Sequence, residues 1–265
     1  MPIWLYDVSP LLSALIIIVF VELLSLVGLF IARRFLVHRF HYGEGINDAI
    51  SGTVQAIGVF YGITVGLIAV GVWNTNTAAA DLVSREASSI GTLYRDVSSY
   101  PSPLREELQG KLRQYSIFII NEAWPAQRKG EDNFRGTPMM TEFQDKLYTF
   151  QPANLSQQAM HDETLRAYNK LIDFRQLRID AVNSGLSGTM WAVIWLGAAI
   201  SIGVAYFYQI IDGKLHAVLI ILMAGFLALV IFMITINDRP FYGRNGISAT
   251  PYQLIIDRLM NGNLS

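Results

Sequence analysis

The stretch LLSALIIIVFVELLSLVGLFI, residues 11–31, is long and apolar enough to cross a lipid bilayer as an α-helix. Three stretches of similar length and character follow it, at 49–72, 189–211 and 216–236. Because a backbone in lipid must satisfy its own hydrogen bonds, each stretch is predicted to be a transmembrane helix. The sequence therefore predicts an integral membrane protein with four spans, in contact with the lipid bilayer.

The composition agrees with this prediction. Hydrophobic residues make up 52% of the 265 residues, charged residues make up 15%, and the mean hydropathy is +0.35. An ordinary soluble domain carries about 25% charged residues. The net charge of −1 provides no basic surface for nucleic acid, so no nucleic-acid partner is expected. The absence of cysteine excludes disulfides, thiolate metal ligands and cysteine nucleophiles.

A polar insert separates the second span from the third, and its periodicity is helical. After the second span, apolar residues recur at spacings of three and four, as in a helix that packs along a neighbour: Ala80, Val83, Ala87, Ile90, Tyr94 and Val97. This seam can be buried within one chain or between subunits. The predicted fold is all-α, with four transmembrane helices in two hairpins and an all-helical soluble insert between the second and third spans.

The same pattern predicts the domain boundaries. Residues 1–74 form the first transmembrane hairpin, 75–186 the helical soluble domain, 187–237 the second transmembrane hairpin, and 238–265 a C-terminal segment that docks on the soluble domain. Pro240 disfavours helical geometry at Arg239, so the chain is expected to turn after the last span. Asp238 and Arg239 would hold this turn against the first or last helix of the insert, and Phe241 would be buried there. The alternative is a solvated turn with a disordered tail.

The second span carries small and polar residues on nearly one face: Ser51, Gln55, Gly58, Gly62, Gly66, Ala69 and Trp73. Two interpretations stay open. Small residues at intervals of four allow helices to pack closely. They also leave room in a pore, where Ser51 and Gln55 would offer hydrogen bonds to ions or water.

Glu22 lies in the middle of the first span, where an ionisable side chain is costly unless it is protonated, paired or in contact with water. It is therefore a candidate ion or proton site. The alternative is a protonated glutamic acid that bonds to a neighbouring hydroxyl group. Tyr61, Thr64 and Ser201 lie at a similar depth and are its candidate partners.

The sequence offers no catalytic arrangement, metal site or cofactor site. His38, His41 and Glu44 recur at intervals of three, but Gly43 and Gly45 interrupt any helix that would place them on one face. A complete nucleophile elbow, a phosphate-binding glycine loop and a metalloprotease motif are all missing. An enzyme is therefore not predicted, nor is a metal or a cofactor.

Several motifs together resemble a known family. The sequence resembles the bacterial bestrophin-like proteins of the DUF4239 group in these segments: Gly58 to Gly66, Val72-Trp73-Asn74, Arg85-Glu86-Ala87, Leu93-Tyr94-Arg95, and Asn237-Asp238-Arg239-Pro240-Phe241-Tyr242-Gly243 followed by Ile247-Ser248 and Pro251. The resemblance implies an ion channel of the bacterial inner membrane, homo-oligomeric and by analogy pentameric, whose second span lines a neck and continues into a helical body. The aromatic neck and the acidic calcium-binding run of animal bestrophins are not reproduced, so calcium gating and anion selectivity are not expected.

The expected function is therefore a homo-oligomeric channel or pore for inorganic ions, with the second span along the pathway. The alternative is a membrane-anchored sensor or scaffold whose helical insert binds a partner. The side of the membrane that holds the insert stays open. Arg33, Arg34, Arg39 and Lys214 in the short loops favour an insert outside the cell, whereas the resemblance favours a cytosolic insert.

Overall fold

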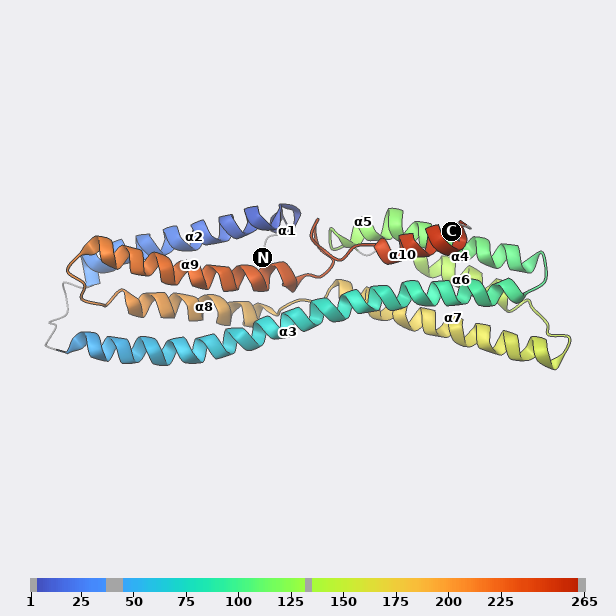
Figure 1. Cartoon of the computed structure of the whole chain (residues 1–265), viewed down its shortest axis with the longest axis horizontal. Helices are drawn as coiled ribbons and strands as arrows, with labels where there is room; N and C mark the ends of the chain where they lie inside the picture. Colours follow the sequence, from blue (N-terminus) through green and yellow to red (C-terminus); the bar gives the residue numbers. More distant parts are fainter. Residues whose placement is uncertain (1–3, 37–44, 132–134, 262–265) are drawn as a thin grey trace. The chain divides into compact units, whose positions relative to one another are not determined.

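The computed structural model describes residues 4–36, 45–131 and 135–261, and every regular element within them is a helix (Figure 1). Four helices are long and apolar enough to cross a membrane. The predicted all-α class and the four candidate spans are thereby confirmed. The chain divides into two compact units. The membrane unit comprises Met1–Asn74 and Gly185–Asp238, and the helical body comprises Thr75–Ser184 and Arg239–Ser265.

The membrane unit contains the four candidate spans. They are α2 (Pro10–Ile31), the first part of α3 (Ile46–Asp96), α8 (Gly188–Ala205) and α9 (Gly213–Asp238), preceded by the short α1 (Trp4–Asp7). Side chains cap three of these helices at the N-terminus, and for α9 the cap is Asp212, whose Oδ1 accepts a hydrogen bond of 2.8 Å from the backbone N–H of Lys214. Ser9 Oγ accepts a hydrogen bond from the backbone N–H of Leu12, and Ser187 Oγ accepts one from that of Met190, each at 3.3 Å.

The first span packs mainly along the fourth rather than along the second (Figure 1). Between α2 and α9, Ile17, Val21 and Ala224 belong to one buried apolar core. The second span instead contacts the third, because the Tyr61 hydroxyl donates a hydrogen bond of 2.9 Å to the carbonyl oxygen of Ile194. Gly197 makes room for this ring, since a Cβ there would lie 2.3 Å from Tyr61 Cδ2.

The helical body contains the second part of α3 and the remaining helices. They are α4 (Leu104–Phe118), α5 (Trp124–Gln127), α6 (Gly136–Leu147), α7 (Leu155–Val182) and α10 (Thr250–Ile255). One-turn π-helical segments, Ile119–Ala123 and Ile256–Met260, join α4 to α5 and continue α10. Asn154 caps α7 by accepting the N–H of Gln157 at 2.9 Å.

The predicted apolar seam of α3 lies in the core of the helical body. Val83, Ala87, Ile90 and Val97 are buried there together with residues of α4, α6, α7 and the C-terminal segment. Of the two interpretations left open by the sequence, burial within one chain therefore explains the seam.

Candidate functional site

The glycines of the second span face away from their own chain. Gly58, Gly62 and Gly66 are exposed, and a Cβ built at any of them would meet no described atom within 4 Å. They therefore do not serve close packing between helices of one chain. A second copy, a pathway or lipid can still cover them.

The other residues of this stripe divide between two environments. Gln55 is exposed, and Trp73 is 60% exposed. Ser51 is half-buried, and its Oγ accepts a hydrogen bond of 3.0 Å from the Tyr208 hydroxyl. Ala69 is only 6% exposed and belongs to the apolar core of the membrane unit. Ala69 therefore does not share the outward face that the sequence pattern assigned to it.

Glu22 faces the fourth span. Its Oε1 would lie 3.0 Å from a Cβ at Gly225, so the missing side chain at that glycine leaves space for the carboxyl group. The hydroxyl groups suggested as partners bond elsewhere: Tyr61 to the Ile194 carbonyl, Thr64 to Phe60 and Ser201 to Gly197. Among the described residues, no hydrogen-bond partner of the Glu22 carboxyl group is found.

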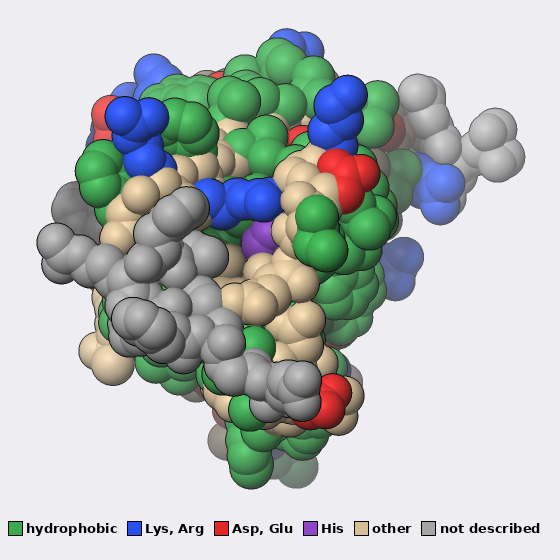
Figure 2. Space-filling model, turned by 90° about the vertical axis from the view of Figure 1, so that its left-hand side faces the viewer, with side chains coloured by type: hydrophobic (Ala, Val, Ile, Leu, Met, Phe, Trp, Pro, Cys, Tyr) green, Lys and Arg blue, Asp and Glu red, His purple; other side chains and the backbone are tan. Residues whose placement is uncertain are grey.

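Basic residues lie at the end of the membrane unit where α8 connects to α9. Arg33 Nη2 donates a hydrogen bond of 3.3 Å to the carbonyl oxygen of Ile210. His216, only 2% exposed, lies 3.1 Å from the carbonyl oxygen of Ala205 through Nε2. Figure 2 shows this end of the chain, with Lys and Arg side chains beside apolar flanks.

The structure contains no metal cluster in the part that it describes. Within residues 4–36, 45–131 and 135–261, no group of three His, Asp or Glu side chains could hold an ion. His38, His41 and Glu44 lie outside these ranges.

A buried carboxylate lies at the centre of the helical body. Glu86, on α3, is 0% exposed, and its oxygens accept hydrogen bonds from three side chains. Tyr115 donates to Oε1 and Tyr252 donates to Oε2, each at 3.0 Å. Arg178 donates from Nε to Oε2, and from Nη2 to Oε1 at 3.3 Å. Helices α3, α4, α7 and α10 therefore meet at one ion pair.

Arg178 has further partners. Its Nη1 donates to Gln127 Oε1 at 3.0 Å, and its guanidinium carbon lies 5.7 Å from the ring centre of Trp124. Burial lowers the pKa of Arg178, but the Glu86 carboxylate and the neighbouring tyrosines outweigh this effect, so the pKa is raised. Arg178 therefore carries its positive charge throughout the ordinary pH range.

The two tyrosines donate to the carboxylate as neutral groups. Burial, and then the negative charge of Glu86, raise the pKa of both Tyr115 and Tyr252. A buried charge is tolerated when it is paired and fully hydrogen-bonded. The Glu86 cluster, comprising Glu86, Arg178, Tyr115 and Tyr252, meets this condition and fixes how the four helices pack.

Sequence reasoning did not identify this cluster, because Glu86 stood out only as part of the Arg85-Glu86-Ala87 motif. A signal was nevertheless present. Glu86 follows Val83 by three residues and precedes Ile90 by four, so it lies on the buried side of the seam. A charged residue within an apolar helical face predicts a buried partner.

The segment after the last span begins with two anchors. Asp238 is 4% exposed, and it accepts the backbone N–H of Leu186 at 2.6 Å and the indole N–H of Trp191 at 3.3 Å. It therefore binds the start of the third span, not a helix of the insert as the sequence suggested. Arg239 donates at 3.3 Å to the carbonyl oxygen of Asn183, directly after α7.

Comparison with known proteins gives a consistent result. The model of the Bestrophin-like domain family matches residues 19–252. A crystal structure of a bacterial bestrophin homolog from Klebsiella pneumoniae with a point mutation has a TM-score of 0.69 at 9% identity, covering 94% of this chain and 99% of that chain. Another mutant of that homolog has a TM-score of 0.66 at 8% identity, covering 95% of this chain and 100% of that chain.

At these identities the solved structures establish a shared fold. The search of curated proteins finds no match. The family model, in contrast, covers most of the sequence, including the motifs on which the resemblance was based. The chain therefore belongs to the Bestrophin-like domain family.

Proposed function

We propose that the protein is a homo-oligomeric channel or pore for inorganic ions of the bacterial inner membrane, in which α3 lines the pathway. Membership of the Bestrophin-like domain family and the likeness to bacterial bestrophin homologs support a channel-like role. The observation that carries the proposal is the row of small and polar residues on α3 that its own chain leaves uncovered. Such residues suit water and ions better than lipid tails.

Within the membrane unit, five residues of the row alternate at spacings of four and seven. All are exposed except Ser51, which is half-buried: Ser51, Gln55, Gly62, Gly66 and Trp73. A repeat of eleven residues corresponds to 3.67 residues per turn, close to the α-helical period, so the row stays on one face of the helix. One continuous face is what a helix needs to border a common axis in a closed, symmetric assembly.

Large apolar side chains are also exposed on α3, outside this row. Val59, Phe60, Ile63 and Leu67 are all more than half exposed and apolar. Large apolar side chains suit lipid or the packing surface of a second subunit. In α3, small and polar residues are therefore exposed along one row and large apolar residues are exposed beside it, as in a helix that borders both a pathway and lipid or a neighbouring subunit.

Gly62→Leu tests this assignment, and Gly71→Leu is its matched control. Gly71 is also exposed, and it lies nine residues further on, on the opposite side of the helix. The leucine side chain would fill the pathway, so we expect Gly62→Leu to lower ion flux in proteoliposomes about tenfold. This corresponds to an increase of about 1.4 kcal/mol in the free-energy barrier to ion passage. Gly71→Leu should retain flux.

Each variant is first checked for oligomeric size in detergent, so that lost assembly is separated from a blocked pathway. Unchanged flux in a correctly assembled Gly62→Leu protein would contradict the pore-lining role. A correctly assembled wild-type protein that conducts no ion would favour the alternative, a membrane-anchored sensor or scaffold.

Glu22 is proposed to be a structural residue and not an ion or proton site, because its carboxyl group faces Gly225 on α9 and not α3. The substitution Glu22→Gln keeps its size and removes its titration. We expect ion flux, and the dependence of flux on pH, to stay the same in liposomes. A flattened pH profile in this variant would instead show that Glu22 is the ion or proton site.

A further inference from the structure

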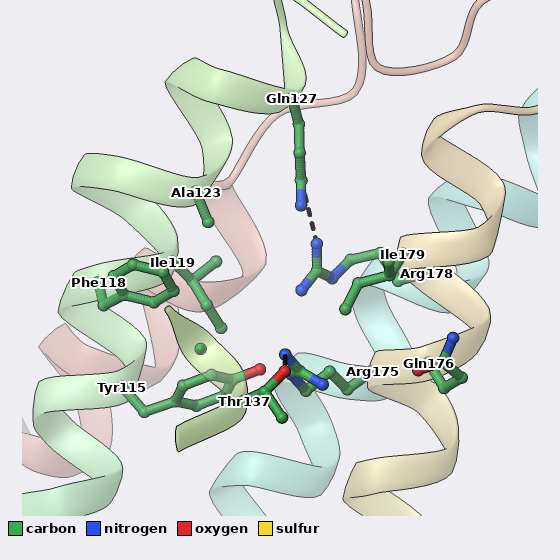
Figure 3. Close-up of a pocket in the computed structure, with 11 residues that line it drawn as sticks. Tyr115, Phe118, Ile119, Ala123, Gln127, Thr137, Arg175, Gln176, Arg178 and Ile179 are labelled. Carbon is green, nitrogen blue, oxygen red and sulfur yellow. Dashed lines mark hydrogen bonds between the residues drawn. The ribbon is translucent and has the colours of Figure 1, made fainter. Parts of the chain in front are cut away.

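A cavity of about 130 Å³ lies within the helical body, between α4, α5, the start of α6 and α7 (Figure 3). Its polar lining includes Tyr115, Gln127, Thr137, Arg175 and Arg178. No Asp or Glu lines it in the described part of the chain. The cavity is much larger than a single water molecule needs, and its lining is positive.

Arg175 supplies a positive charge that no carboxylate neutralises in the described part of the chain. It is 8% exposed, and its Nη2 donates to the Thr137 hydroxyl at 3.0 Å. Among the described residues, no carboxylate lies within ion-pair distance of Arg175. The neighbouring Arg178 differs, because Glu86 pairs with it. A guanidinium has five N–H donors, and burying one without an anion is costly.

The start of α6 adds donors on the same wall. Gly136 and Thr137, the first two residues of this 12-residue helix, line the cavity, and the N-cap residue Arg135 makes no side-chain capping hydrogen bond. The backbone N–H groups at a helix N-terminus favour an anion, and in α6 Gly136 and Thr137 carry such groups whereas Pro138 does not. A Cβ at Gly136 would lie 3.3 Å from Arg175 Nη2 and 3.1 Å from Phe118 Cε1, so glycine lets the helix start close to the guanidinium.

The remaining polar groups suit an oxygen-rich anion. The Thr137 hydroxyl accepts from Arg175 and can donate its own hydrogen to a ligand. Gln127 uses its oxygen for Arg178, which leaves its NH₂ group as a donor. Thr137 and Gln176 are exposed, so the cavity opens to solvent on their side. Its volume suits one small oxyanion and is too small for a nucleotide.

We propose that this cavity binds a small oxyanion of the phosphate or sulfate class between Arg175, Thr137 and the first turn of α6. The ligand neutralises Arg175 and stabilises the helical body when it is bound. This site is separate from the pathway along α3, and the proposal does not depend on the channel function.

Thermal unfolding of the purified full-length protein tests the proposal, because the order of stability of the wild type and the Arg175→Gln variant should reverse when phosphate is added. In phosphate-free buffer, Arg175→Gln should unfold at the same temperature as the wild type or higher, because an uncompensated buried charge is removed. In inorganic phosphate at equal ionic strength, the wild type should become the more stable protein, because a ligand that binds only the folded state stabilises it. Arg166→Gln, on the exposed side of α7, should respond to phosphate as the wild type does.

Calorimetric titration with inorganic phosphate, sulfate, acetate and chloride completes the test. We expect saturable binding of phosphate and sulfate, weaker binding of acetate, none of chloride, and at least a tenfold loss of phosphate affinity in Arg175→Gln. If that variant does not fold, Arg175→Lys and Thr137→Val should each still weaken phosphate binding. The proposal is overturned if the wild type binds no phosphate or sulfate, or if the folded variants bind them as tightly as the wild type.

Discussion

Glu86→Ala is expected to destabilise the helical body by about 3–5 kcal/mol, because it removes one partner of a buried ion pair and leaves the other charge uncompensated. The substitution leaves the Arg178 charge, only 2% exposed, without its carboxylate. It also removes the acceptor of the Tyr115 and Tyr252 hydroxyl groups. Thermal or denaturant unfolding of the purified protein, followed by the signal of its buried tryptophan Trp124, would measure the loss.

The same helix provides a matched control. Arg85 and Asp81 form an exposed ion pair at 2.6 Å, with side chains 57% and 55% exposed. Because exposed pairs contribute little, Asp81→Ala should cost less than about 1 kcal/mol. If Glu86→Ala and Asp81→Ala cost the same, the Glu86 cluster does not hold the helices together.

A double substitution separates the charge from the packing. Glu86→Leu combined with Arg178→Met removes both charges and leaves apolar side chains of similar volume. Replacing a buried ion pair in this way is often neutral or stabilising, so the double variant should be more stable than either single variant. The difference between the single and double variants then measures the coupling between Glu86 and Arg178.

The fold class could be predicted from the sequence because the apolar lengths determine the four spans and the periodicity of the insert is helical. A stretch such as residues 11–31 has few alternatives to a membrane helix. Which spans pack together could not be predicted in the same way, since large apolar side chains occur all around α2 and its charged residue, Glu22, does not show which span it faces. Only the structure shows that α9 is the partner of α2, because Ala224 shares a buried core with Val21 and Gly225 leaves space for the Glu22 carboxyl group.

The candidate site was predictable in part. The glycines of α3 could be identified by their spacing, but spacing could not tell an outward face from a packed one. Ala69 follows Gly66 by three residues and is nevertheless buried, whereas Gly66 is exposed. Arg178 was not recognisable as the partner of Glu86, because 92 residues separate the two and the seam around Glu86 indicates that it has a buried partner but not which residue that is.

Phe241→Ala is expected to cost about 3–5 kcal/mol, because it removes a buried aromatic side chain. Phe241 is 1% exposed, and its ring meets that of Trp124 edge-on, with ring centres 5.7 Å apart. Trp124 also contacts Tyr252 at 5.5 Å, and its indole N–H donates to the Ile247 carbonyl oxygen at 3.0 Å. One tryptophan of α5 thus contacts three residues of the C-terminal segment.

Loss of the Phe241 ring should therefore also weaken the contact between Tyr252 and Glu86. Thermal unfolding and limited proteolysis of the C-terminal segment would show lower stability and faster cleavage.

Leu254→Ala, at a residue of α10 that is 42% exposed, is the control and should cost less than about 1 kcal/mol. Arg239→Ala should fall between them, because it removes one bond to Asn183 and a contact with the Tyr242 ring at 5.3 Å.

The three substitutions distinguish a docked segment from one that only lies on the surface. Under docking, the order of destabilisation follows burial: Phe241 first, Arg239 next and Leu254 last. Combining Phe241→Ala with Glu86→Ala should cost less than the sum of the two single effects, since both weaken the same contact of Tyr252. Strict additivity would mean that Phe241 and Glu86 stabilise the helical body independently, and that the position of Tyr252 in the folded state does not depend on the Phe241 ring.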